Sequence, residues 1–294
     1  MEDKFKEFNA KKEKTSKSVI IGGVILGLAI IIFFLLSATV DPVAGQVIGI
    51  IVGIVGFVFL IKGSMDFKNL SKRFKTEVLM GVFEEAIPGI KYSPDQGLSQ
   101  FDVYAGEFLK RADRFYSEDL MKGTLDDVDF ISSDVRLEER RVEHTKNGTR
   151  VYYVPYFIGR IFKFTFNKEF EGYLQVLESG SPLSNRKFKK VELESIDFNK
   201  KFKTYSTTEL SAFYVLTPDI MEAIMNLEKR NPGRIGLSFT GETLYIAINN
   251  NKDTFELKMF RKIDDSVVEE FKQDLLVVKD VIVALKLNNR LFKK

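Results

Sequence analysis

The chain has 294 residues, with 27 phenylalanines, no cysteine, no tryptophan and a net charge of +3. The lack of cysteine excludes disulfides, thiolate nucleophiles and Cys-ligated metals. The charge is uneven, because residues 1–75 hold 11 Lys and Arg against 6 Asp and Glu, whereas residues 76–294 hold 33 against 35. Domains that bind nucleic acids carry a basic surface, so the near-neutral remainder argues against nucleic acid as a partner.

Two apolar runs near the N-terminus, Val19–Leu36 and Val43–Ile61, contain no charged residue. A helix needs about 20 apolar residues to cross a hydrocarbon layer of about 30 Å. The runs therefore predict a transmembrane helical hairpin with spans over residues 18–38 and 43–62. A cleaved signal peptide is the alternative for the first run, because Ser37-Ala38-Thr39 resembles a cleavage site, but the run is longer than the apolar part of such peptides.

Lysines and arginines flank this hairpin on both sides, whereas the loop between the spans has none. Segments rich in Lys and Arg next to a span stay in the cytosol. We therefore expect both ends of the hairpin in the cytosol and Asp41 on the outer side of the membrane. A first segment, residues 1–17, is then a basic cytosolic tail.

Glycines spaced by four residues follow one face of each span, and such faces let helix backbones approach closely. The residues concerned are Gly23, Gly27, Gly45, Gly49 and Gly53. They indicate either self-association between copies or packing of the two spans on each other, and we favour the second. Since neither span holds an ionisable residue, a transport pathway is not indicated. The hairpin is interpreted as an anchor.

From Asp66 to Ala86 apolar residues recur at helical spacing, and Pro88-Gly89 ends the pattern. This predicts a juxtamembrane amphipathic helix within residues 63–90. Such a helix can lie on the bilayer surface or pack on its own domain, and we favour packing. Residues 91–294 remain as a cytosolic α+β domain.

Within this domain the apolar period changes to two from residue 128 onward, which is typical of strands. A hairpin turn is predicted at Asn147-Gly148, and helices are predicted over Phe101–Leu109, after Thr217-Pro218-Asp219 and from near Asp265. The predicted fold is α+β, with a largely antiparallel sheet. Further strands are expected at Val151–Tyr156, Arg160–Phe166, Gly172–Glu178, Lys190–Ile196, Leu210–Leu216, Arg234–Phe239, Thr243–Ile248 and Phe255–Phe260.

Five sequence blocks follow one another in the second half of the chain: Phe157–Arg160, Phe162–Phe166, Glu194–Phe202, Leu216–Met221 and Ser238–Ile248. Together with the two-span hairpin, they resemble the bacterial domain-of-unknown-function family 3137. The resemblance implies a multi-pass protein of the bacterial plasma membrane with its soluble domain in the cytoplasm and no established activity. It implies no catalytic residues, and it suggests a LemA-type membrane protein as a candidate partner.

The sequence predicts no catalytic set, metal site or cofactor. His144 is the single histidine and lies beside the predicted turn, so an exposed hairpin position is the favoured interpretation. The acidic run Asp126, Asp127 and Asp129 suggests a metal-dependent hydrolase as a remote alternative. It lacks the ligand pattern of a calcium loop, so a solvated turn is favoured.

Two basic stretches suggest contact with anionic lipid headgroups or with a partner protein: Arg186, Lys187, Lys189 and Lys190, and Lys200, Lys201 and Lys203. The simpler interpretation is that solvated charges flank the buried Phe188 and Phe202. We therefore expect a membrane-anchored, non-catalytic cytosolic scaffold or interaction domain that binds a protein at the inner membrane face. A module that binds or senses anionic lipid headgroups is the alternative.

Overall fold

The computed structural model describes residues 2–39, 41–146, 148–184, 186–231 and 233–285, with the side chains of 166–169 outside the description. The chain forms two compact units, each held together by its own contacts. The helical unit contains Met1–Gly81 and Glu256–Glu270, and the sheet unit contains Val82–Phe255 and Phe271–Lys294.

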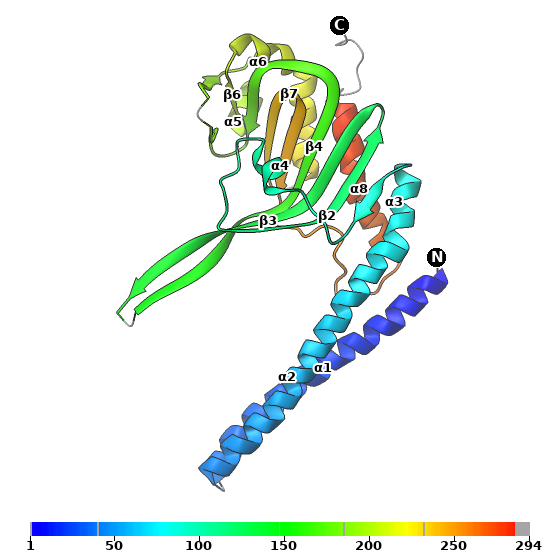
Figure 1. Ribbon diagram of the computed structural model, residues 1–294, viewed down its shortest axis with the longest axis vertical. Coiled ribbons are helices and arrows are strands. Elements are labelled where there is room, and N and C mark those ends of the chain that lie inside the picture. The colour runs from blue at the N-terminus through cyan, green and yellow to red at the C-terminus, as the bar shows by residue number, and fades with distance from the viewer. Residues whose placement is uncertain (1, 40, 147, 185, 232, 286–294) are drawn as a thin grey trace. The chain divides into compact units, whose positions relative to one another are not determined.

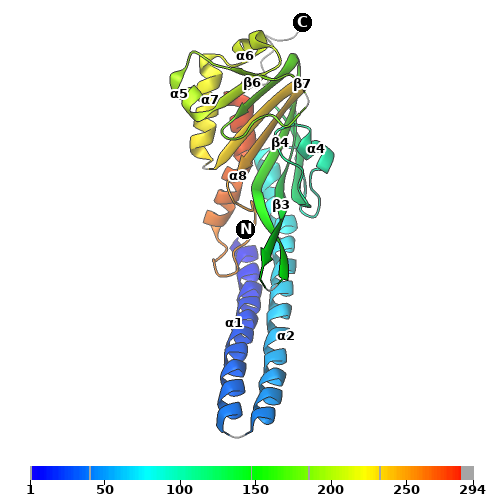
Figure 2. The ribbon, with the colours of Figure 1, turned by 90° about the vertical axis from the view of Figure 1, so that its left-hand side faces the viewer.

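The helical unit is built on an antiparallel pair of long helices, α1 (Glu2–Thr39) and α2 (Pro42–Phe74), which lie side by side in Figure 2. Asp41 caps α2, because its Oδ1 accepts hydrogen bonds from the amides of Val43 at 2.7 Å and Ala44 at 3.0 Å. Proline is well suited to the first helical position that follows such a cap. A short π-helix, η1 (Lys75–Leu79), leads into α3 (Met80–Ala86).

Both long helical segments are long and apolar enough to cross a membrane. Few residues of their most apolar stretches are buried: 11% of that stretch in α1 and 17% of that stretch in the segment Pro42–Ala86. A core helix of a soluble protein would instead be mostly buried. The prediction of two apolar helices at the N-terminus is confirmed.

Glycines allow α1 and α2 to pack closely along their length. A Cβ on Gly22 would lie 2.8 Å from the backbone oxygen of Gly56, and one on Gly49 would lie 2.7 Å from the Cβ of Phe33. Gly45 is similarly packed, and Gly53 has room for a methyl group. Cβ atoms on the predicted Gly23 and Gly27 would meet nothing within 4 Å. The glycine of α1 at this contact is therefore Gly22.

Residues 2–17 continue the helix of the first apolar run. Phe8 packs edge-on against Phe74 of α2, with ring centroids 5.4 Å apart. The side-chain amide of Asn9 donates to the Ile263 carbonyl at 2.7 Å and its oxygen accepts from the Ile263 amide at 2.9 Å.

The segment predicted as a strand at Phe255–Phe260 is irregular instead, so that prediction was wrong.

The apolar stripe that follows the second span is buried in protein. Leu70, Phe74, Val78 and Leu79 are each at most 4% exposed. Burial of these residues agrees with packing on the protein's own residues and disagrees with a helix lying on the bilayer. The helix ends at Ala86, as Pro88-Gly89 predicts.

The sheet unit contains seven strands in the described residues, and every pairing is antiparallel (Figure 1). Their order is β1-β2-β3-β4-β6-β5, and β7 pairs with the other edge of β4. This confirms the α+β class and the antiparallel sheet. The strands are β1 (Lys91–Ser93), β2 (Arg114–Leu125), β3 (Val128–Thr145), β4 (Gly148–Leu177), β5 (Lys189–Val191), β6 (Lys203–Ser206) and β7 (Arg234–Asn249).

Several predicted strands merge or change type. The three predicted strands between residues 151 and 178 form the single strand β4, and those between 234 and 248 form β7. The segment predicted as a strand at Leu210–Leu216 is mostly helix α6 (Glu209–Val215), which corrects that prediction. The remaining helices are α4 (Gln100–Tyr104), α5 (Ile196–Lys201), α7 (Pro218–Arg230) and α8 (Asp265–Ala284), and the last two agree with the predicted helix starts.

Candidate functional site

A buried arginine stands at the centre of the sheet unit. Arg160 on β4 lies directly opposite Asp134 on β3, and its Nη1 donates to Asp134 Oδ1 at 2.8 Å. Both side chains are 6% exposed. The guanidinium also donates to the Asp119 carbonyl at 3.0 Å and to the Ser132 hydroxyl at 3.2 Å. One cation thus joins β2, β3 and β4.

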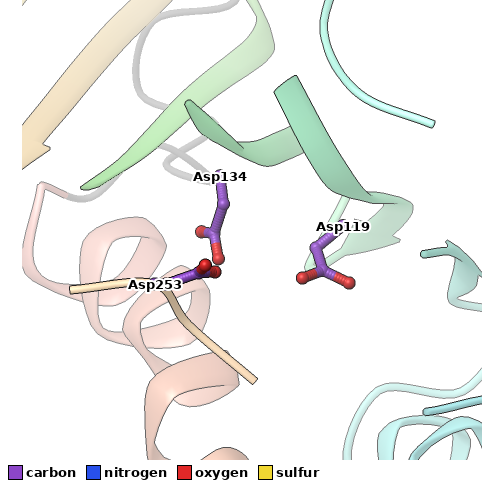
Figure 3. A group of neighbouring side chains, drawn as sticks. All are labelled: Asp119, Asp134 and Asp253. Atoms are coloured by element: carbon purple, nitrogen blue, oxygen red, sulfur yellow. The ribbon is translucent and has the colours of Figure 1, made fainter. Parts of the chain in front are cut away.

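Asp134 belongs to a group of three neighbouring carboxylates. Oxygens of Asp119, Asp134 and Asp253 lie within 4.8 Å of one another, and Figure 3 shows how the three side chains lie. Asp119 has a φ of 56° at the bulge of β2, a conformation that few residues other than glycine adopt. The strained backbone places its carboxylate where the Tyr92 hydroxyl donates to it.

Burial raises the pKa of Asp134 to about 7, with Asp119 and Asp253 acting in the same direction and Arg160 opposing them. Burial and the adjacent Asp119 also raise the pKa of Tyr92. Charged carboxylates lose hydration when buried, and like charges nearby add to this cost. The arrangement therefore favours a proton on Asp134 at mildly acidic pH.

Carboxylates in this number are the usual ligands of hard cations. Here the protein engages both oxygens of Asp134, because its Oδ2 accepts from the Thr254 amide at 2.7 Å while its Oδ1 accepts from Arg160, and Asp119 accepts from the Tyr92 hydroxyl. The Arg160 guanidinium supplies the positive charge that compensates Asp134. We interpret the group as a structural polar network.

The acidic run expected from the sequence lies elsewhere. Asp126 and Asp127 form the two-residue turn between β2 and β3, with φ values of 51° and 62°. Positive φ at both positions is the hallmark of a type I′ hairpin turn, which Asp tolerates. Asp129 accepts a hydrogen bond from the Thr124 hydroxyl at 2.5 Å. The structure therefore agrees with the interpretation of this segment as a turn.

The most exposed part of the sheet unit is a two-stranded ribbon that we call the hairpin arm, residues 139–145 of β3 and 148–154 of β4. Pairing between β2 and β3 ends at Arg114↔Glu138, and pairing between β4 and β7 ends at Gly159↔Asn249. Beyond these points β3 and β4 pair only with each other. The two strands project beyond the sheet in Figure 1.

Both edges of the hairpin arm present backbone groups that point away from the paired strand. The Arg140 amide points outward, since it donates to the Asp113 carboxylate at 2.7 Å. In an antiparallel pair, the backbone N–H and C=O groups of successive residues point alternately toward the partner strand and away from it. When one residue points away, the residue directly opposite it also points away. The backbone groups of Val142 and His144 therefore also point outward, on the β3 edge of the arm. Those of Thr149, Val151 and Tyr153 point outward on the β4 edge.

One face of the arm carries an apolar pair. Val142 lies directly opposite Val151, and the two side chains are 42% and 45% exposed. His144 follows on the same face and contacts the Thr149 hydroxyl at 3.0 Å, which agrees with the exposed position expected for the single histidine. At the base, the Arg114 guanidinium lies 3.4 Å from the centroid of the Tyr153 ring.

The predicted basic contact residues are mostly engaged with carboxylates. Arg186 donates to Glu107 at 3.0 Å, and Lys201 lies 3.0 Å from Glu178 and 2.8 Å from Glu228. Lys190 pairs with Glu192, and Lys200 lies 3.4 Å from Asp197. Lys187, Lys189 and Lys203 have no such partner among the residues that the structure describes. Their role in lipid or partner contact stays a prediction.

Helix α6 presents an apolar face to solvent, which the sequence did not predict. Leu210, Phe213 and Tyr214 are 78%, 49% and 58% exposed and lie on one side of the helix, at spacings of three and four. The helix contacts β5 and β6, which carry Lys189 and Lys203. Exposed apolar residues beside lysines are typical of binding surfaces.

The fold thus defines an α+β protein with an open antiparallel sheet and two apolar helices capable of spanning a membrane. Residues 156–287 match the family described as "Protein of unknown function (DUF3137)", which confirms the resemblance drawn from the sequence. The mycobacterial trehalose monomycolate transport factor A, TtfA, has a similar solved structure, with 7% identity, a TM-score of 0.38 and coverage of 72% of this chain and 96% of that one. No curated protein sequence matches the chain.

Proposed function

We propose that the protein is a membrane-anchored, non-catalytic interaction domain, and that the hairpin arm binds a protein partner at the inner membrane face. The observation that carries this proposal is the arm itself. A two-stranded ribbon gains little stability on its own, and unpaired strand edges invite pairing with other chains. A partner strand that joined either edge would satisfy the outward backbone groups.

The charges of the arm indicate what the partner carries. Its arginines, Arg140, Arg141 and Arg150, outnumber its glutamates, Glu139 and Glu143. Glu139 is already neutralised, because Lys110 lies 2.5 Å and Arg141 3.0 Å from its carboxylate. An acidic strand is therefore the best complement. The LemA-type membrane protein that the family resemblance suggests is the first candidate to test.

The cytosolic orientation rests on the flanking charges. Basic residues precede the first span and follow the second, and the connecting loop has only Asp41. By the positive-inside rule this favours an arm that faces the cytoplasm of a bacterial cell.

A photo-crosslinking amino acid at Val142 tests the proposal in intact membranes. We expect a discrete adduct with one membrane-associated protein, and we expect it to disappear when Val151→Glu is added. The control carries the crosslinker at Phe101, which is 82% exposed on α4. The same adduct from both positions, or an adduct that survives Val151→Glu, would contradict a role of the arm.

The apolar face of α6 favours lipid contact as a second candidate function. A cysteine at Tyr214, labelled with an environment-sensitive dye, reports insertion of this face into a bilayer. With the full chain in phosphatidylcholine nanodiscs, added phosphatidylglycerol vesicles are expected to shift the emission to the blue, and Lys189→Glu is expected to weaken the shift. An unchanged spectrum would eliminate this alternative.

A further inference from the structure

A row of lysines crosses the sheet unit away from both the hairpin arm and α6. Lys91 on β1 is directly opposite Lys122 on β2, and Lys122 is directly opposite Ile131 on β3. Ile131 is in turn opposite Lys163 on β4. Side chains directly opposite one another lie on the same face of a sheet. Three ammonium groups therefore share one face across four strands.

A shallow cleft of about 490 Å³ lies along this row. Besides the three lysines, its lining includes the hydroxyls of Thr124 and Thr165 and the carboxylate of Asp129. Gly123 also lines it, and a Cβ there would lie 2.9 Å from the Phe130 ring. The volume falls within the range of about 300–1,000 Å³ that is typical of small-molecule sites.

The charges in the cleft are incompletely compensated. Lys163 pairs with Asp102 at 3.0 Å. Among the described residues, Lys91 and Lys122 have neither an ion-pair nor a hydrogen-bond partner. Like charges directly opposite one another on a sheet are destabilising. An anion between these two ammonium groups would relieve that repulsion.

We propose that this cleft binds a phosphate-bearing anion. The phosphate oxygens accept hydrogen bonds from Lys91 and Lys122, because ammonium groups bind phosphate strongly as point charges. The carboxylate of Asp129 and the hydroxyl of Thr165 suit ligand hydroxyls, which favours a phosphate ester of a polyol. Such an ester has two sources, a lipid headgroup and a soluble metabolite. The site is independent of the proposed role of the arm.

The test uses the full chain in phosphatidylcholine nanodiscs with two probes. Glycerol 3-phosphate represents the soluble ester, and its binding is followed by ³¹P line broadening and by the unfolding temperature. Phosphatidylglycerol vesicles represent the headgroup, and their binding is followed by co-flotation. The site variant is Lys91→Gln/Lys122→Gln. The matched control, Lys229→Gln/Lys279→Gln, removes the same charge from α7 and α8, where both lysines are exposed and have no partner among the described residues.

We expect the site variant to weaken binding of the active probe by about tenfold or more and the control variant to leave it unchanged. Binding of the ester alone assigns a soluble ligand, and binding of the vesicles alone assigns a lipid headgroup. Without ligand, the site variant is expected to unfold at the same or a higher temperature than the wild type, because repulsion is removed. Failure of both probes to bind the wild type, or equal loss in both variants, would overturn the proposal.

Discussion

Arg160 and Asp134 face each other across β4 and β3, 2.8 Å apart, with both side chains 6% exposed. Removing one partner of such a buried pair leaves an uncompensated charge. We expect Arg160→Met to lower the free energy of unfolding by about 3–5 kcal/mol, because Asp134 would lose its cation. Urea unfolding of the full chain in nanodiscs, followed by circular dichroism, measures the change.

A matched control uses the exposed pair of Arg141 and Glu139, which are 3.0 Å apart. Exposed ion pairs contribute at most about 1 kcal/mol. Arg141→Met should therefore change the free energy of unfolding little. Equal losses for Arg141→Met and Arg160→Met would show that burial of the Arg160 network does not matter.

The raised pKa of Asp134 predicts a pH dependence with a definite sign. The pKa is about 7 in the folded chain against an ordinary value of 3.8. Between about pH 4 and pH 7 the folded state holds a proton that the unfolded state has released, so this group makes the free energy of unfolding fall as pH rises, by at most about 4 kcal/mol.

Other groups act in the opposite direction, such as Asp264, whose pKa is lowered by a hydrogen bond from Ser266. The difference between the wild type and Asp134→Asn isolates the contribution of Asp134. We expect the free energy of unfolding of the wild type to fall relative to that of the Asn variant between pH 4 and pH 7. Parallel pH profiles would contradict the assignment.

Lys12 is buried in the helical unit at 6% exposure, and its ammonium has no hydrogen-bond partner among the described residues. Burial lowers its pKa, and Asp264 opposes the shift. We expect Lys12→Met to raise the free energy of unfolding by about 1–3 kcal/mol, since a buried unsatisfied charge is removed. The gain should shrink at alkaline pH, where the lysine is neutral. The exposed Lys14→Met is the control and should have little effect.

Neighbouring glycines of α1 distinguish packing within one chain from association between copies. Gly22 lies against α2, whereas Gly23 faces open space. We expect Gly22→Leu to lower the unfolding temperature in nanodiscs, because a side chain there would clash with the backbone of Gly56, and we expect Gly23→Leu to have no such effect. A crosslinked dimer that Gly23→Leu abolishes would instead indicate that this face joins two copies.

Sequence periodicity predicted the elements whose burial follows a simple pattern. The stripe of α7, with Ile220 and Ile224 buried, and that of α8, with Leu275 and Ile282 buried, both appear at their predicted places. The apolar spans were equally clear. Such elements bury one continuous face, and this is the signal that a period of 3.6 detects.

Other features depend on contacts between distant residues. Asp134 and Arg160 are 26 positions apart, and Thr254 completes their network from 120 positions beyond Asp134. No local sequence pattern predicts such a group. The presence of Asp134 and Arg160 within two buried strands could still have indicated a buried ion pair. The segment Leu210–Leu216 has the composition of a strand, but it buries only Ala212 and Leu216 and forms a helix. Short apolar runs do not distinguish the two.

The sidedness of the hairpin arm tests the central claim most directly. The chain has no native cysteine, so single cysteines at Asp41, in the loop between the spans, and at His144, on the arm, report location without background. In intact bacteria, a membrane-impermeant maleimide is expected to modify Asp41→Cys and to reach His144→Cys only after the cells are permeabilised. Modification of His144→Cys with protection of Asp41→Cys would contradict a cytosolic interaction domain.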